Sequence, residues 1–140
     1  MPYIFKQKLQ IQELVDLQQP IKRILIHEPE EYLAALYQHY LQVHNFDIKH
    51  CPVLESLEVS AKNFAPDVLI FNIGENHNSK AEWLLKFKKD FPEAGVITTG
   101  FNTNSEILKL LLSAGISSHI NRKLTRPQDI AVVVKSMLQN

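Results

Sequence analysis

The chain contains the stretch Pro66-Asp67-Val68-Leu69-Ile70-Phe71-Asn72, in which four apolar residues run without interruption. An unbroken apolar run of this length is typical of a parallel β-strand that is covered on both faces. In open parallel sheets, ligands and reacting groups lie at the carboxyl ends of the strands. The residue at that end is Asn72, whose amide is neither a nucleophilic carboxylate nor a general acid or base. The stretch therefore predicts a familiar kind of sheet that lacks its usual reactive group.

Strand and helix patterns alternate five times from residue 22 onward. Short apolar runs predict the strands, and apolar residues three or four positions apart predict the helices. The strands are expected near 24–26, 46–51, 68–72, 95–100 and 117–121, and the helices near 30–44, 54–64, 79–91, 103–114 and 125–138. Such alternation implies right-handed crossovers and a parallel sheet with helices on both faces. We therefore predict a flavodoxin-like three-layer α/β/α sandwich with a five-stranded parallel sheet of order 2-1-3-4-5.

Local signals predict where two helices begin and where one ends. Ser79 and Glu82 have the spacing of a capping box, and so do Thr103 and Glu106. Gly115 stands where a left-handed residue would end the fourth helix. These positions give the predicted helices defined boundaries.

Residues 21–140 form one predicted domain, and residues 1–20 form an additional N-terminal helical segment. The apolar residues of this segment are compatible with one amphipathic helix: Phe5, Leu9, Ile11, Leu14, Val15 and Leu17. Two interpretations stay open for it. The helix lies on the domain and covers apolar surface, or it docks on a partner or a second copy of the chain.

Composition and charge narrow the class of protein. Fifteen Lys and Arg residues balance fifteen Asp and Glu residues, so the net charge gives no reason to expect nucleic acid or an anionic membrane as a partner. The single cysteine, Cys51, excludes an internal disulfide and suits a reducing compartment. No stretch has the length and apolarity of a membrane span. We expect a cytoplasmic protein.

Polar residues follow the predicted strands in an ordered series. Glu28 follows the first strand, Asn72 the third, Thr98 or Thr99 the fourth, and Lys123 or Arg122 the fifth. The stretches that carry the series are Arg23-Ile24-Leu25-Ile26-His27-Glu28-Pro29, Pro66 to Asn72, Val96-Ile97-Thr98-Thr99-Gly100, and Ser113-Ala114-Gly115-Ile116 leading to Lys123. Over roughly residues 21 to 140 this series resembles the receiver domain of bacterial two-component response regulators.

The resemblance implies a phosphorylation pocket at the strand ends. In that family an aspartate on the third strand accepts a phosphoryl group from a histidine kinase, two acidic residues help to hold Mg²⁺, and a Ser/Thr and a Lys bind the phosphoryl oxygens. Here Asn72 stands at the acceptor position, Pro29 at the second acidic position, and His119 at the position of the switching aromatic residue. The resemblance therefore implies a degenerate pocket made of Glu28, Asn72, Thr98, Thr99 and Lys123, and strict counting from Gly115 favours Arg122 over Lys123.

These departures have chemical consequences. The Asn72 amide is neutral and poorly nucleophilic, so ordinary aspartyl phosphorylation is excluded at that atom. Mg²⁺ prefers hard oxygen ligands in octahedral geometry, and Glu28 is the one matched anionic ligand that remains. Glu30 and Glu31 are better explained as acidic residues at a helix start. We expect no cofactor, weak or absent Mg²⁺ binding, and no enzymatic activity.

The resemblance also implies a protein-binding face made by the fourth helix, the fifth strand and the fifth helix. In the fourth helix, Ile107, Leu110 and Leu111 are expected to face the core, which leaves Leu108 and Leu112 as an apolar excess, and Val132 adds to it from the fifth helix. Alternatively, the two leucines pack under a neighbouring loop or under the N-terminal segment. A protein partner is expected on this face, and a homodimer is one form that it takes.

The sequence thus predicts a phosphorylation-independent pseudo-receiver, meaning a receiver-like domain that regulates a partner by binding alone. Two alternatives stay open. One is a phosphorelay receiver with an unconventional acceptor, and the weaker one is a small-molecule binder built on a flavodoxin-like sheet.

Overall fold

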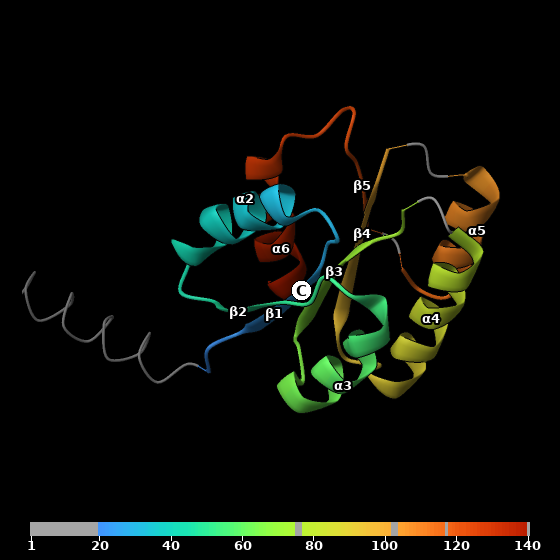
Figure 1. Cartoon of the computed structure of the whole chain (residues 1–140), viewed down its shortest axis with the longest axis horizontal. Coiled ribbons are helices and arrows are strands. Elements are labelled where there is room, and N and C mark those ends of the chain that lie inside the picture. The colour runs from blue at the N-terminus through green and yellow to red at the C-terminus, as the bar shows by residue number, and fades with distance from the viewer. Residues whose placement is uncertain (1–19, 75–76, 102–103, 117, 140) are drawn as a thin grey trace, which may run out of the picture.

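The computed structural model describes residues 20–74, 77–101, 104–116 and 118–139. Five strands form one parallel sheet in the order β2-β1-β3-β4-β5 (Figure 1). The strands are β1 (Arg23–His27), β2 (Asp47–His50), β3 (Val68–Asn72), β4 (Gly95–Gly100) and β5 (Ser118–Asn121). The predicted flavodoxin-like fold and its strand order are confirmed. The predicted N-terminal segment, except for Pro20, lies outside the described residues.

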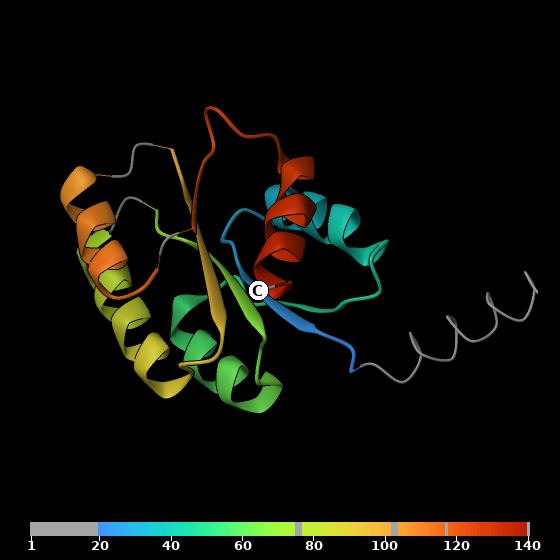
Figure 2. The ribbon, with the colours of Figure 1, turned by 180° about the vertical axis from the view of Figure 1, so that it is seen from behind.

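Helices cover both faces of the sheet. One face carries α2 (Glu31–Gln42) and α6 (Ile130–Leu138), which follows a short 3₁₀ turn at Pro127–Asp129. The other face carries α3 (Leu54–Phe64), α4 (His77–Asp90) and α5 (Ser105–Ser113). Figures 1 and 2 show these two helical layers with the sheet between them. No helix in the described part of the chain has the length and apolarity needed to cross a membrane.

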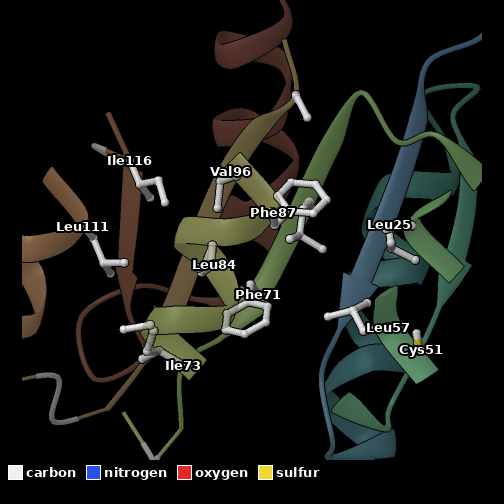
Figure 3. Packing of buried hydrophobic residues seen from close by; sticks show 14 of the residues in the cluster. Leu25, Cys51, Leu57, Phe71, Ile73, Leu84, Phe87, Val96, Leu111 and Ile116 are labelled. Carbon is white, nitrogen blue, oxygen red and sulfur yellow. The ribbon is translucent and has the colours of Figure 1, made fainter. Parts of the chain in front are cut away.

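The central strand β3 is buried along its whole length. Because side chains alternate between the faces of a strand, Leu69 and Phe71 pack towards α3, α4 and α5, whereas Val68 and Ile70 pack towards α2 and α6. Figure 3 shows Phe71 in the first of these layers, near Leu84 of α4. Burial on both sides explains why the strand has no polar residue before Asn72.

A row of nearly parallel rings lies along α4 and contacts β3 at one end. We call it the aromatic stack, and it consists of Phe71, Trp83, Phe87 and Phe91. Successive ring centroids are 5.4, 5.5 and 4.8 Å apart, with interplanar angles of 8°, 16° and 20°. Each such pair contributes about 1 kcal/mol beyond the burial of its area. The stack begins one residue before Asn72 and runs along α4.

Some helix boundaries differ from those predicted. Helix α4 begins at His77, so Ser79 lies inside the helix and is not its cap. The cap of α5 is Asn104, whose Oδ1 accepts a hydrogen bond from the Glu106 N–H at 2.7 Å. Gly115 does adopt the predicted left-handed conformation, with φ of +85°. Asn104 competes successfully with the neighbouring residue because asparagine is a strong capping residue.

The expected inward orientation of Leu110 is wrong. Its side chain is 41% exposed, whereas Ile107 and Leu111 are buried. The buried face of α5 is centred on Ile107 and Leu111, which lie one turn apart, and Leu110 falls on the flank of that face. The face of α5 that contacts the core is therefore narrower than predicted, and Leu110 lies at the surface.

Candidate functional site

Glu28 and Asn72 lie side by side at the carboxyl edge of the sheet. Strands β1 and β3 are neighbours in a register that pairs His27 with Phe71, and this places the next residue of each strand together. Asn72 Nδ2 donates hydrogen bonds to Glu28 Oε1 at 2.8 Å and to Glu28 Oε2 at 3.0 Å. Both residues are buried. The structure therefore brings together the two residues on which the predicted pocket depends.

Glu28 accepts further hydrogen bonds at its carboxylate and at its backbone carbonyl. Its Oε2 also accepts a hydrogen bond from the Glu30 N–H at 2.9 Å, and its backbone carbonyl accepts one from His50 Nε2 at 2.8 Å. An ionised carboxylate only accepts hydrogen bonds, so the NH₂ group of Asn72 must be the side of the amide that faces it. An aspartate at position 72 would instead place a second negative charge against Glu28.

The two threonines of β4 have different surroundings. Thr98 Oγ1 lies 2.8 Å from His119 Nδ1 on the neighbouring strand, and both residues occupy paired positions of the register. Thr99 is paired with Asn72 in the register, and its hydroxyl is buried without a hydrogen-bond partner among the described residues. Burial lowers the pKa of His119. Thr99 is thus the threonine adjacent to the Glu28–Asn72 pair, while Thr98 and His119 bond to each other.

Comparison with solved structures gives close likenesses in three dimensions. A response regulator from Thermotoga maritima aligns with a TM-score of 0.77 at 10% identity, over 86% of this chain and all of that chain. A CheY-like response regulator receiver domain protein from Methanospirillum hungatei gives a TM-score of 0.77 at 20% identity, over 86% of this chain and 95% of that chain. An orphan response regulator of H. pylori gives 0.75 at 17%, over 85% and 99%. The chain has a receiver fold. No protein-family model and no curated protein matches its sequence.

The two basic residues that follow β5 do not join the Glu28–Asn72 pair as expected. Lys123 is exposed, and within the described ranges its side chain has no ion pair or hydrogen bond. Arg122 Nη2 instead lies 3.1 Å from Glu30 Oε2, in a partly exposed ion pair. Within the described residues, neither side chain forms an ion pair or a hydrogen bond with Glu28.

The lysine that does reach the Glu28–Asn72 pair was not predicted from the sequence. Lys80, in the first turn of α4, donates a hydrogen bond from Nζ to the Asn72 carbonyl oxygen at 2.7 Å. Burial lowers the pKa of Lys80, and the negative charge of Glu28 opposes that shift. No sequence signal marked this residue, because it lies on a helix and occupied the middle of an expected capping box. The contact depends on where α4 begins.

The residues around the Glu28–Asn72 pair do not fit Mg²⁺. Both Glu28 oxygens already accept hydrogen bonds from Asn72 or Glu30, and the Asn72 side chain presents N–H donors towards the carboxylate. Octahedral Mg²⁺ is usually bound through carboxylate oxygens and water. Among residues 20–74, 77–101, 104–116 and 118–139, no group of three His, Cys, Asp or Glu side chains has the arrangement of a metal site.

His27 is a buried polar residue beside this pocket. Its Nδ1 donates to the Cys51 carbonyl oxygen at 3.0 Å, and its Nε2 has no hydrogen-bond partner in the described part of the chain. Burial lowers the pKa of His27 to about 4, although the hydrogen bond to Cys51 works in the opposite direction. A proton on Nε2 would be buried without an acceptor, so the ring is neutral at ordinary pH.

The three apolar residues predicted for partner binding lie on two helices. Leu112 of α5 and Val132 of α6 are 62% and 69% exposed, while Leu108 is half-buried. Helices α5 and α6 belong to opposite layers and flank the edge strand β5. Figure 2 shows the two helices on either side of the sheet. A partner that contacts both exposed side chains must therefore span the β5 edge.

Proposed function

We propose that the chain is a phosphorylation-independent signalling module of the receiver type, which acts by binding a protein partner. The observation that carries this proposal is the pair of hydrogen bonds from Asn72 Nδ2 to the Glu28 carboxylate. In the resemblance on which the site was predicted, position 72 would hold the aspartate that accepts the phosphoryl group. An amide there is a poor nucleophile, and here it is also committed to a buried acceptor.

The receiver fold supports the signalling part of the proposal, since the solved structures with similar folds are described as response regulators and receiver domains. Their sequence identity to this chain is 20% or less, so function is inferred from the pocket as well as from the fold. The pocket contains neither a carboxylate acceptor at position 72 nor a donor set suited to Mg²⁺.

Exposed apolar side chains support the binding part of the proposal. Leu112 on α5 and Val132 on α6 are too exposed to contribute to the core. Leu110 on α5 is a third exposed apolar side chain. Apolar groups at a surface, with charged residues around them, are typical of contact sites between proteins. Lys109 and Lys135 are exposed on the same two helices and supply such charges.

Treatment with a phosphodonor tests the central claim. The purified chain is incubated with acetyl phosphate and Mg²⁺, and its intact mass is measured beside a receiver that has an aspartate acceptor. We expect the mass of this chain to stay unchanged while the other receiver gains a phosphoryl group. A phosphoryl group stably added to this chain would refute the proposal and favour an unconventional acceptor.

A further inference from the structure

The Lys80 side chain reaches back from α4 to the end of β3. Its Nζ lies 2.7 Å from the Asn72 carbonyl oxygen and 5.5 Å from the centroid of the Phe71 ring. Gly74, in the loop between, has φ of +61°, and a Cβ atom added there would lie 3.4 Å from Nζ and 3.7 Å from Asn72 Oδ1. A glycine suits this position because it tolerates the left-handed conformation, and a Cβ atom there would only touch the lysine.

Asn72 connects Lys80 to Glu28. Its side-chain amide donates to the buried carboxylate, and its backbone carbonyl accepts from the ammonium group. Within the described residues, no Lys or Arg nitrogen lies within 4.0 Å of Glu28, since Arg122 pairs with Glu30 instead. Glu28 nevertheless acts on Lys80 electrostatically. The buried negative charge of Glu28 is thus balanced by the half-buried positive charge of Lys80, with Asn72 between the two.

We propose that the Lys80 ammonium is the resident cation of this pocket and that it excludes divalent metal ions. A buried carboxylate needs a nearby positive charge or a strong set of donors. The lysine and the neutral donors together meet that need without a metal, and the ammonium would repel a divalent cation bound at Glu28. The inference rests on the proposed function because it concerns the same pocket, but it makes a separate claim about what blocks metal binding.

Restoring the second carboxylate separates the effect of Lys80 from that of Asn72. We compare the wild-type chain, Asn72→Asp, and Asn72→Asp combined with Lys80→Gln. Mg²⁺ is titrated by calorimetry and by fluorescence of Trp83, the sole tryptophan, which stacks on Phe71 at 5.4 Å. We expect no saturable binding by the wild type, and roughly tenfold tighter binding by the double variant than by Asn72→Asp.

Three further variants in the Asn72→Asp background control the experiment. Lys86→Gln removes an exposed lysine from the same helix, where it pairs with Glu58 at 3.2 Å, and should leave Mg²⁺ affinity unchanged. Lys80→Arg keeps the charge and should bind as weakly as Asn72→Asp. Lys80→Met is a second neutral replacement that serves if Lys80→Gln does not fold.

The outcomes distinguish this inference from the proposed function. Equal Mg²⁺ affinities with and without a charge at position 80 would overturn the inference, and so would tight Mg²⁺ binding by the wild type. Neither result would show that Asn72 accepts a phosphoryl group, so neither would refute the proposed function. Conversely, a stable phosphoryl group on the wild-type chain would refute the proposed function. The role of Lys80 would still be decided by the comparison of Mg²⁺ affinities.

Discussion

At the scale of single residues, His27 should make the stability of the domain depend on pH. Its pKa falls from 6.5 to about 4 on folding because the ring is buried. The unfolded chain therefore binds more protons than the folded chain between these values, so the free energy of unfolding rises with pH across that range. The shift corresponds to about 3 kcal/mol, which is fully present above pH 6.5 and lost as the pH falls towards 4.

Urea unfolding of His27→Gln at pH 7.5 and pH 4.5 tests this prediction. The variant should lose most of the difference in stability between the two pH values that the wild type shows. His39→Gln, which replaces an exposed histidine on α2, should behave like the wild type. An equal pH dependence in the wild type and His27→Gln would assign the effect to another group.

The pairing of Glu28 with Asn72 was predictable from the sequence, whereas the approach of Lys80 was not. The first follows from topology, because the carboxyl ends of neighbouring parallel strands meet at one edge. The second depends on the length of the β3–α4 connection and on the residue at which α4 begins. A shift of two residues in that start would rotate Lys80 away, and boundaries of this kind are weakly encoded locally.

At the scale of the elements, the residue that ends α3 has a strained backbone conformation that a substitution could relieve. Ala65 caps the helix in the left-handed conformation, with φ of 51°. That conformation costs roughly 1 kcal/mol for a residue with a Cβ atom, so Ala65→Gly should raise the free energy of unfolding by up to about 1 kcal/mol. Thermal and urea unfolding provide the measurement.

A second alanine provides the matched control for Ala65→Gly. Ala114 caps α5 with φ of −89°, where glycine offers no relief. Ala114→Gly should therefore lower the stability by about 0.5–1 kcal/mol through the greater freedom of the unfolded chain. If both substitutions change stability in the same direction, conformation at the cap is not the cause.

The close approach of α6 to β4 gives a prediction about packing. A Cβ atom added at Gly95 would collide with Met137 Sδ and lie 2.8 Å from its Cγ. Gly95→Ala should destabilise the domain by roughly 1–3 kcal/mol because the thioether must move. In a Met137→Ala background the same substitution should cost much less. A double-mutant cycle from urea unfolding measures the coupling, and additive effects would contradict the prediction.

Helix boundaries show why some elements were predicted less well than others. Gly115 was identified correctly, since few residues other than glycine tolerate a φ of +85°. The start of α5 was assigned to Thr103, yet Asn104 holds the cap. Two adjacent residues of good capping type cannot be ranked from sequence, because the choice depends on the tertiary position of the helix. The same dependence explains the exposure of Leu110.

At the scale of the whole molecule, alternation of strands and helices determined the fold class. The two core layers could be predicted without knowing individual side-chain contacts, because apolar runs of the right length and order already specify a sheet covered on both faces. The surface was less predictable. Leu108, Leu112 and Val132 were predicted on a face made by the fourth helix, the fifth strand and the fifth helix, and α5 and α6 do flank β5, from opposite layers. The sequence pattern alone does not show that these two helices lie in opposite layers, on either side of β5.

Partner capture tests the proposed binding surface. In a pull-down from the native host, the Leu112→Glu, Val132→Glu variant should lose a protein that the wild type retains, because both side chains are exposed and a charge disrupts an apolar contact. The melting temperature should stay near that of the wild type. Val59→Glu, an equally exposed position on α3, should retain the partner. Leu108 is a poorer choice, since it is half-buried and its replacement also affects folding.

The aromatic stack has a consequence for how the molecule opens. Sliding or turning α4 would separate Trp83 from Phe71 and would also withdraw the buried side chains of Leu84 and Phe87 from the core, so the middle of this helix has no inexpensive local opening. We expect amide protons near Trp83 and Phe87 to exchange with solvent as slowly as those of β3, through global unfolding only. Hydrogen–deuterium exchange would show this directly. Faster exchange in α4 than in β3 would mean that the rings part while the sheet stays intact.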